Sequence, residues 1–231
     1  MQRIVVFDVD GVLLHLTPAE EEGFFLALKE LHGLDGLSRD WDSYRIRNDV
    51  DIVAEVLERR FGRPAAPAEI AAWRRRYLAI MADWLDRGVF AVEPVAGAAA
   101  LLGDLRGRGI AVGIATANII EAARLRLARA GLWSLIDHAE GADGGGPKSV
   151  LLGRLLARLD VPRSGVVYVG DNLNDVEAGR THAGHFIGFS VEAERRRRLA
   201  ANGAAHVAAS HDDTRRLIGT MFSELSEERT S

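Results

Sequence analysis

An apolar run near the N-terminus ends abruptly in two acidic residues, and this pattern restricts the possible folds more than any other feature. Ile4–Phe7 has the composition of a buried strand, and Asp8, Asp10 and Gly11 follow it closely. Two carboxylates about 4 Å apart repel each other by roughly 4 kcal/mol at an effective dielectric near 20. A divalent cation or a bound proton would offset that repulsion, and Gly11 allows a tight turn close to a ligand. The pattern predicts a metal-assisted site at the end of a strand; the alternative is a strand that ends in an acidic turn.

The composition narrows the classes of protein. The chain has 231 residues, of which 48% are apolar and 27% charged, as expected for a globular protein with one large domain or a core with an insertion. A net charge of −4 gives no basic field for nucleic acid, and the lack of cysteine excludes disulfides and thiol chemistry. Acidic residues interrupt the first apolar run, and no apolar run is long enough to span a bilayer. We therefore expect a cytoplasmic protein without nucleic-acid or membrane partners, with its oligomeric state open.

The segment from residue 16 to residue 91 has a helical pattern throughout. Its first helix, beginning at Thr17 and stopping at Gly33, has an N-cap, a proline in the first turn and Glu20 as the partner of a capping box. Apolar residues recur at helical spacing over 49–61 and from about 68 to 88. We expect three helices, with the aromatic stripe of the third in their shared core rather than around a cofactor.

From residue 94 onward, helical and strand patterns alternate. Helices are predicted at 96–109, 119–130, 192–201 and 212–222 and after Pro147, and strands at 110–116, 136–139, 166–169, 186–189 and 206–208. This alternation predicts a parallel sheet with helices on both faces. We expect an α/β, Rossmann-like doubly wound fold with an inserted α-helical cap. The core would comprise 1–15 and 92–223, the cap would comprise 16–91, and 224–231 would form a polar tail.

Polar residues follow several of the predicted strands. Asp8, Thr116 and Asp171 each stand at the carboxyl end of a strand, where open α/β sheets place their sites. Carboxylates on separate strands, with Asp175 nearby, can hold Mg²⁺, which prefers oxygen ligands. Lys148 stands in the first turn of a helix, where the helix dipole opposes a cation, so a nearby anion would explain it. A hydroxyl and a lysine can bind phosphate oxygens; the alternative for Lys148 is a solvated helix residue.

Together these residues resemble a known family. Asp8-Val-Asp10-Gly11, Thr116, Lys148 and Gly170–Asp175 are similar, in order and separation, to the four motifs of the haloacid dehalogenase (HAD) superfamily. The resemblance covers essentially the whole chain. The helical insertion is similar to the cap of the subfamily that includes phosphoglycolate phosphatases and β-phosphoglucomutases.

The resemblance implies a role for each motif. Asp8 would be the nucleophile that forms an aspartyl-phosphate, and Asp10 would protonate the leaving oxygen and then activate water. Mg²⁺ would be the cofactor, bound by Asp8, the backbone carbonyl of Asp10, Asp171 and Asp175. The phosphoryl group would be held by Gly11, Thr116, Ala117, Asn118 and Lys148.

The expected reaction follows from Asp10, because an aspartate two residues after the nucleophile favours phosphate-ester chemistry over dehalogenation within the superfamily. We expect a Mg²⁺-dependent hydrolase that cleaves a small phosphate monoester. A phosphosugar mutase similar to β-phosphoglucomutase would use the same nucleophile and is the main alternative. A receiver-like signalling protein or a non-catalytic phosphate-binding protein is a remote one.

Some segments depart from the family pattern or contain charged residues whose role has more than one interpretation. Leu14–Thr17 replaces the Asp-Ser of many phosphoglycolate-phosphatase-like members, and His15 there could face the substrate or lie at a surface hinge. Arg45 and Arg47 could grip a second anionic group of the substrate or belong to a solvated loop. We expect the run Arg195–Arg198 to be a solvated helix face.

Overall fold

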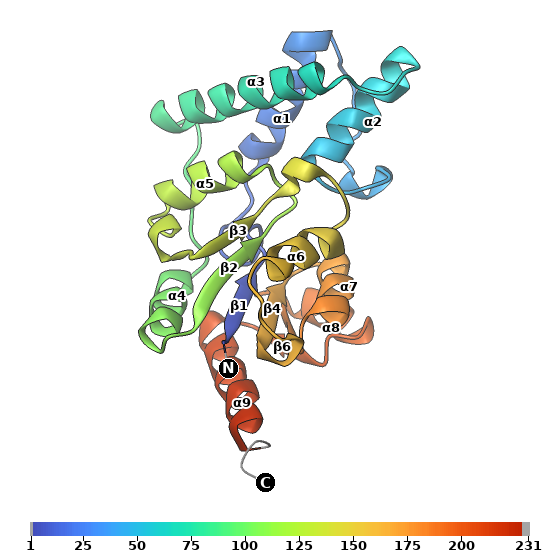
Figure 1. Cartoon of the computed structure of the whole chain (residues 1–231). Coiled ribbons are helices and arrows are strands. Elements are labelled where there is room, and N and C mark those ends of the chain that lie inside the picture. Colours follow the sequence, from blue (N-terminus) through green and yellow to red (C-terminus); the bar gives the residue numbers. More distant parts are fainter. Residues whose placement is uncertain (1, 228–231) are drawn as a thin grey trace.

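The structure, a computed structural model, describes residues 2–227 and is built around a parallel sheet (Figure 1). Within those residues the sheet has six strands in the order β3-β2-β1-β4-β5-β6, and every neighbouring pair is parallel. The strands are β1 (Ile4–Phe7), β2 (Ala111–Ala115), β3 (His138–Glu140), β4 (Val166–Gly170), β5 (His185–Phe189) and β6 (His206–Ala208). This is the α/β, Rossmann-like arrangement that the alternating pattern predicts.

Helices cover both faces of the sheet because successive strand residues point to opposite sides. Val5 and Phe7 belong to one buried cluster and Ile4 and Val6 to another. The first cluster takes in α4 (Ala98–Gly107), α5 (Ile120–Arg129) and α9 (His211–Glu227). The second takes in α6 (Lys148–Ala157), α7 (Leu173–His182) and α8 (Ala193–Ala201). None of the helices between residues 2 and 227 is long and apolar enough to cross a bilayer.

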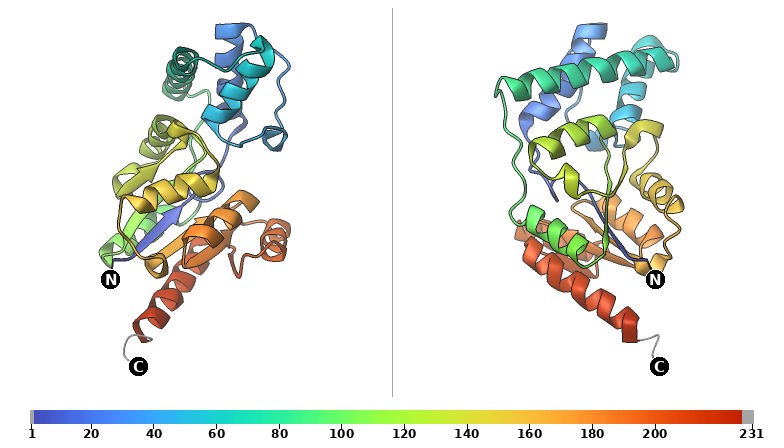
Figure 2. Two further views of the ribbon diagram at one scale, coloured as in Figure 1. Left: turned by 45° about the vertical axis from the view of Figure 1, so that its right-hand side comes forward. Right: turned by 60° about the vertical axis from the view of Figure 1, so that its left-hand side comes forward.

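Three further helices stand apart from these layers, beyond the carboxyl ends of the strands (Figures 1 and 2). They are α1 (Pro18–His32), α2 (Asp49–Phe61) and α3 (Pro67–Asp86), which we call the cap helices. They share an apolar cluster in which Phe24 makes edge contacts with Trp41 and Trp73. Ile119 and Ala122, at the start of α5, join this cluster and so connect the cap helices to the sheet-bearing part.

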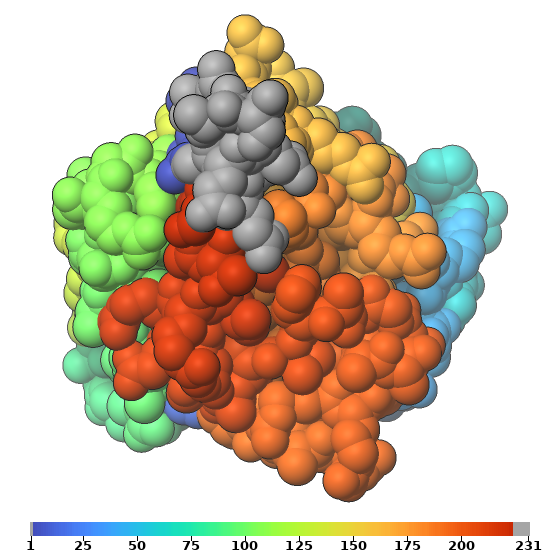
Figure 3. All heavy atoms as spheres, turned by 90° about the horizontal axis from the view of Figure 1, so that it is seen from below, coloured from blue at the N-terminus to red at the C-terminus, as the bar shows by residue number. Residues whose placement is uncertain are grey.

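The C-terminal helix is longer than the sequence pattern predicts. We expected a polar tail from residue 224, but α9 continues to Glu227. Leu225 continues the helical spacing of Met221 and Phe222 in the sequence, and residues 223–227 contain neither glycine nor proline to stop a helix. The rest of the expected tail, 228–231, lies outside the described residues. Seen from the end opposite the cap helices, α9 lies beside α4 (Figure 3).

Candidate active site

The sheet brings two acidic loops together where its strand order reverses. β1 is paired with β2 on one side and with β4 on the other, so the loops after β1 and β4 meet at the switch point. Asp8 follows β1, and Asp171 follows β4; both are buried. Gly11, at φ +76°, packs so closely that a Cβ there would lie 2.3 Å from Oδ2 of Asp171. Only glycine permits this approach of the two loops.

Three buried carboxylates converge at this point. Asp8, Asp171 and Asp175 each offer an oxygen within 4.8 Å of the other two. Asp175 is held rigidly, because the hydroxyl of Tyr168 donates to its Oδ1 at 2.6 Å and the backbone N–H of Asn172 donates to its Oδ2 at 3.0 Å. A set of hard oxygen donors with excess negative charge fits a cation such as Mg²⁺.

Lys148, in the first turn of α6, lies between two of these carboxylates. Its Nζ is 2.8 Å from Oδ1 of Asp8 and 3.0 Å from Oδ1 of Asp175, and the residue is only 5% exposed. Burial lowers the pKa of Lys148, but the charges of Asp175 and Asp8 outweigh burial and raise it above its usual value. Lys148 is therefore a buried, charged partner of the carboxylates and not a solvated helix residue.

Asp8 uses its two carboxylate oxygens differently. Oδ1 accepts from the backbone N–H of Val9 at 2.8 Å and pairs with Lys148, whereas Oδ2 has no hydrogen-bond partner among residues 2–227. Burial raises the pKa of Asp8 above its ordinary value, and Lys148 only partly counteracts this. The side chain is thus anchored through one oxygen, and the other is available to react.

Asp10 belongs to a separate ionic group. Arg126, from α5, places Nη1 2.6 Å from Oδ1 of Asp10 and 2.8 Å from Oε1 of Glu20, and its Nη2 donates to Asn118. Arg126 is 2% exposed and Glu20 is 4% exposed. Glu20 lies on α1, so this buried arginine connects the loop that carries Asp10 with the cap helices.

A cavity of about 170 Å³ opens between these groups and the cap helices. Asp8, Asp10, Lys148 and Asp171 line one part of it. Gly11, Ala117 and Asn118 line it as well, whereas Thr116 is buried, does not line it and bonds through its hydroxyl to Asn118. The arrangement puts the carboxylates of Asp8, Asp10 and Asp171 and the ammonium group of Lys148 around one small space.

Comparison with known proteins identifies the family. Residues 2–182 match the family model of the haloacid dehalogenase-like hydrolases. The chain belongs to this family. Among its HAD relatives, a probable phosphatase, IndB, of Dickeya dadantii is 29% identical over 76% of this chain and 76% of its own length. The phosphoglycolate phosphatase of Synechococcus elongatus is 30% identical over 77% of this chain and 79% of its own length.

Solved structures share the fold. CbbY from Rhodobacter sphaeroides, crystallised with phosphate, matches with a TM-score of 0.69 at 24% identity, over 91% of this chain and 95% of its own. A hydrolase from Pseudomonas syringae matches with a TM-score of 0.67 at 19% identity, over 92% and 95% of the two chains. The family and its named relatives identify this chain as a HAD phosphatase.

The three residues whose roles the sequence left open, His15, Arg45 and Arg47, lie in different environments. His15 is exposed, and Arg45 lies outside the cavity, paired with Glu55 and Glu58 on α2. Arg47 does line the cavity, where its Nη1 is 2.9 Å from Oδ1 of Asp42.

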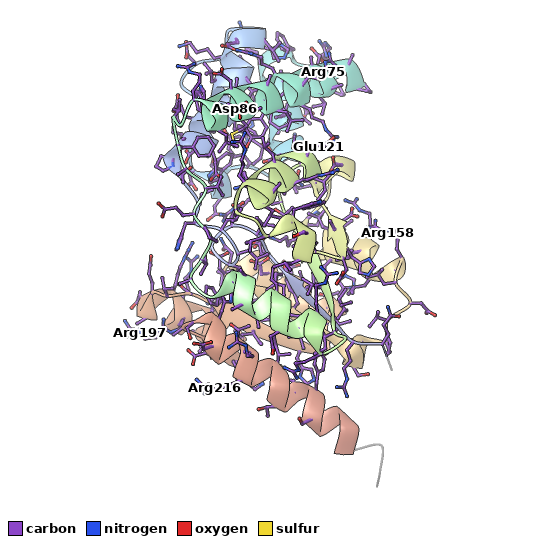
Figure 4. All side chains as sticks on the ribbon, turned by 90° about the vertical axis from the view of Figure 1, so that its left-hand side faces the viewer. Arg75, Asp86, Glu121, Arg158, Arg197 and Arg216 are labelled. Atoms are coloured by element: carbon purple, nitrogen blue, oxygen red, sulfur yellow. The ribbon has the colours of Figure 1, made fainter. Side chains whose placement is uncertain are left out.

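The expectation for the arginine run of α8 was partly wrong. Arg195 turns toward the site, and its Nη1 lies 3.0 Å from Oδ2 of Asp171. Arg197 behaves as expected: it is 72% exposed and lies at the molecular surface (Figure 4). Arg195 is 46% exposed, so it belongs to the solvated face and also pairs with a carboxylate of the site.

Several residues of this HAD site were missed or misread from the sequence. Glu20 was interpreted only as a capping residue; its Oε2 does accept from the N–H of Thr17, but its Oε1 binds Arg126. Arg126 follows the buried Ala122 and Ala123 by four and three positions, so an arginine on the apolar stripe of α5 was the available signal. Tyr77, part of the expected aromatic core, also lines the cavity.

Proposed function

We propose that this chain is a Mg²⁺-dependent phosphatase that hydrolyses a small phosphate monoester through an aspartyl-phosphate on Asp8. The observation that carries the proposal is the state of the Asp8 carboxylate. Lys148 and the N–H of Val9 fix Oδ1, while Oδ2 remains without a partner among the described residues and the side chain lines the cavity. A buried carboxylate held in this way is oriented for attack on phosphorus.

In the first step, Oδ2 of Asp8 forms a bond to phosphorus, and the bond from phosphorus to the ester oxygen breaks. Asp10 gives its proton to the departing oxygen, so the alcohol leaves neutral. In the second step, Asp10 takes a proton from water as the water oxygen attacks phosphorus. Inorganic phosphate leaves, and the carboxylate of Asp8 is restored.

Arg126 supports the change of charge on Asp10. It binds Asp10 and Glu20 through the same nitrogen, Nη1. When Asp10 holds a proton, Glu20 still gives the buried guanidinium an ionised partner, so the arginine is not left as an isolated buried charge. Lys148 keeps Asp8 in place and supplies positive charge near the phosphoryl oxygens.

Asp8, Asp171 and Asp175 would hold the metal, together with the backbone carbonyl of Asp10. Bound Mg²⁺ would supply positive charge that stabilises the phosphoryl oxygens in the transition state. The raised pKa of Asp171, caused mainly by burial and then by Asp175, reflects the excess negative charge that a cation would relieve.

The test is phosphate release from a panel of sugar phosphates, polyol phosphates, nucleotides and phosphoglycolate, with Mg²⁺ and with EDTA. We expect release that depends on Mg²⁺ and is lost in Asp8→Asn, and a phosphate-labelled intermediate in acid-quenched wild-type protein. Release that persists in EDTA or in Asp8→Asn would refute the mechanism. Conversion of a sugar phosphate to its isomer without net release would indicate the mutase instead.

A further inference from the structure

The cap side of the cavity contains an unusual group of buried polar residues. Each cap helix contributes one: Glu20 from α1, Asp49 from α2 and Tyr77 from α3, exposed by 4%, 7% and 4%. All three line the cavity, as does Arg126 from α5. The alcohol part of a phosphate ester bound at Asp8 has to lie on this side, because the loops after the strands surround the phosphoryl group.

Two of these groups have hydrogen-bonding capacity to spare. Glu20 has both oxygens occupied, by Arg126 and by the N–H of Thr17. Asp49 accepts from the N–H of Ile119 at 2.8 Å through Oδ2, and its other oxygen has no partner among residues 2–227. The hydroxyl of Tyr77 likewise has no hydrogen-bond partner in that range. Polar groups so deeply buried are normally satisfied, so these two are available to a ligand in the cavity.

The Tyr77 hydroxyl is held in a fixed position. Its ring stacks on Trp73 at 5.2 Å between centroids and packs edge-on against Phe24 at 5.9 Å. Burial raises the pKa of Tyr77 well above its usual value, and the nearby carboxylate of Asp49 adds to the effect. The phenol therefore stays protonated, and it can both donate to and accept from a neutral hydroxyl group.

The charges of the cavity disfavour a second anion on the substrate. Four cations line it, and each already has a carboxylate partner: Lys148 with Asp8 and Asp175, Arg126 with Asp10 and Glu20, Arg47 with Asp42, and Arg195 with Asp171. No unpaired cation remains among the lining residues that the structure describes. A carboxylate on the leaving group would instead face Glu20 and Asp49.

We propose that Asp49 and Tyr77 recognise a hydroxyl group on the alcohol part of the substrate. The enzyme then selects phosphate esters of polyols or sugars over esters whose leaving group carries a carboxylate, such as phosphoglycolate. This inference rests on the proposed phosphatase function of the same site. It assigns specificity to two residues of the cap helices that take no part in the chemical steps.

The first experiment compares three phosphate esters that differ in the polar groups of the alcohol part. Glycerol 1-phosphate and propyl phosphate have the same carbon chain, and 2-phosphoglycolate carries a carboxylate. We expect kcat/KM for glycerol 1-phosphate to exceed that for each of the others by about tenfold or more, because a site built to bind a hydroxyl rejects analogues without it. Equal kcat/KM for glycerol 1-phosphate and propyl phosphate would overturn the proposal. A higher kcat/KM for 2-phosphoglycolate would overturn it as well.

Binding separates this proposal from the phosphatase mechanism. Calorimetry on Asp8→Asn with Mg²⁺ measures the affinity for glycerol 1-phosphate and propyl phosphate without turnover. Tighter binding of glycerol 1-phosphate would support hydroxyl recognition even if the wild type released no phosphate from any ester, a result that would refute only the proposed reaction. Equal affinities together with normal hydrolysis would refute only the hydroxyl recognition.

Two conservative variants test the named residues. Tyr77→Phe removes only the hydroxyl and keeps the ring, and Asp49→Asn keeps an acceptor for the N–H of Ile119 while replacing the free oxygen with a donor. We expect both to lower the ratio of kcat/KM for glycerol 1-phosphate to that for propyl phosphate toward one, mainly through KM.

Tyr44→Phe is the matched control, because Tyr44 is a buried cap tyrosine whose hydroxyl donates to the carbonyl of Ser38, away from the cavity. It should leave the ratio unchanged. A ratio that falls equally in Tyr44→Phe, or that survives in folded Tyr77→Phe, would contradict the assignment. Thermal melting establishes whether each variant is folded. If a variant is not folded, the ratio of kcat/KM for glycerol 1-phosphate to that for propyl phosphate in the wild type decides the proposal.

Discussion

Nη1 of Arg126 lies 2.6 Å from Oδ1 of Asp10, although the two residues are 116 positions apart in the chain. The same nitrogen binds Glu20 on the first cap helix. A single buried guanidinium thus determines where the second carboxylate of the site stands relative to the cap helices. This contact links the acidic loop after β1 to the cap helices.

Replacing Arg126 with alanine should destabilise the protein and slow the reaction. The substitution leaves Glu20 buried without its ionic partner, and breaking a buried pair in this way costs about 3–5 kcal/mol. We expect the free energy of unfolding, measured in urea at pH 7, to fall by this amount, and kcat to fall with it. Arg129→Ala is the control on the same helix: its pair with Asp86 is largely exposed and should contribute under about 1 kcal/mol. Similar losses in the two variants would contradict the role of Arg126.

Gly11→Ala should abolish the site through a steric clash. The new Cβ would meet Oδ2 of Asp171 at 2.3 Å and displace a carboxylate of the acidic cluster. We expect phosphatase activity and the increase in melting temperature on adding Mg²⁺ both to be lost. Gly33→Ala has nearly the same backbone strain, at φ +65°, but its Cβ would have no neighbour within 4 Å. Activity that is retained in Gly33→Ala and lost in Gly11→Ala would show that the clash with Asp171, and not backbone strain, causes the loss. Equal activity in the two variants would disprove this explanation.

Removing Arg195 should strengthen metal binding. Its guanidinium pairs with Oδ2 of Asp171, so it competes with a cation for the same carboxylate. In Arg195→Ala we expect the Mg²⁺ concentration for half-maximal activity to fall several-fold, because one competing positive charge is gone. Arg197→Ala, on the same helix but paired with Glu194 at the surface, should leave that concentration unchanged. A higher Mg²⁺ requirement in Arg195→Ala would show that Arg195 assists the site instead.

Asp49 should make stability depend on pH. Burial raises its pKa from 3.8 to about 7, although the N–H of Ile119 and Arg126 oppose the shift. The folded state therefore binds more protons than the unfolded state between these values, and the stability from this group declines as pH rises from about 4 through about 7. Between pH 5 and pH 8 the loss is on the order of 2–3 kcal/mol. Urea unfolding in EDTA should show a steeper decline in wild type than in Asp49→Asn; parallel curves would contradict the raised pKa.

The fold was predictable because its signals are local. Buried parallel strands are short apolar runs, and the helices between them repeat their apolar residues at helical spacing. α2 was predicted at its observed bounds, Asp49–Phe61, from the spacing of its apolar residues; in the structure Asn48 caps its start and Gly62 its end. The predicted end of α9 was too early, because the polar residues after Phe222 suggested a tail although no residue there stops a helix.

The candidate site was predictable only in part. Asp8 and Asp171 stand directly after buried strands, so their convergence follows from the parallel order of those strands. Arg195 and Tyr77 gave no such signal, because a charged run predicts a solvated face and an aromatic stripe predicts a core. Each of these residues belongs to such a face or core and also reaches the cavity.

The sequence by itself determined the elements of the sheet, the position of the helical insertion and the acidic ends of the strands. Those features depend on the periodicity of apolar residues and on residues adjacent in the chain. Only the tertiary structure decided that Arg126 pairs with Asp10 and Glu20, that Arg47 rather than Arg45 lines the cavity, and that Asp49 and Tyr77 keep unused hydrogen-bonding groups. The physical reason is that burial and charge pairing depend on which distant side chains lie close together. Which side chains lie close together depends on how the cap helices pack beyond the carboxyl ends of the strands.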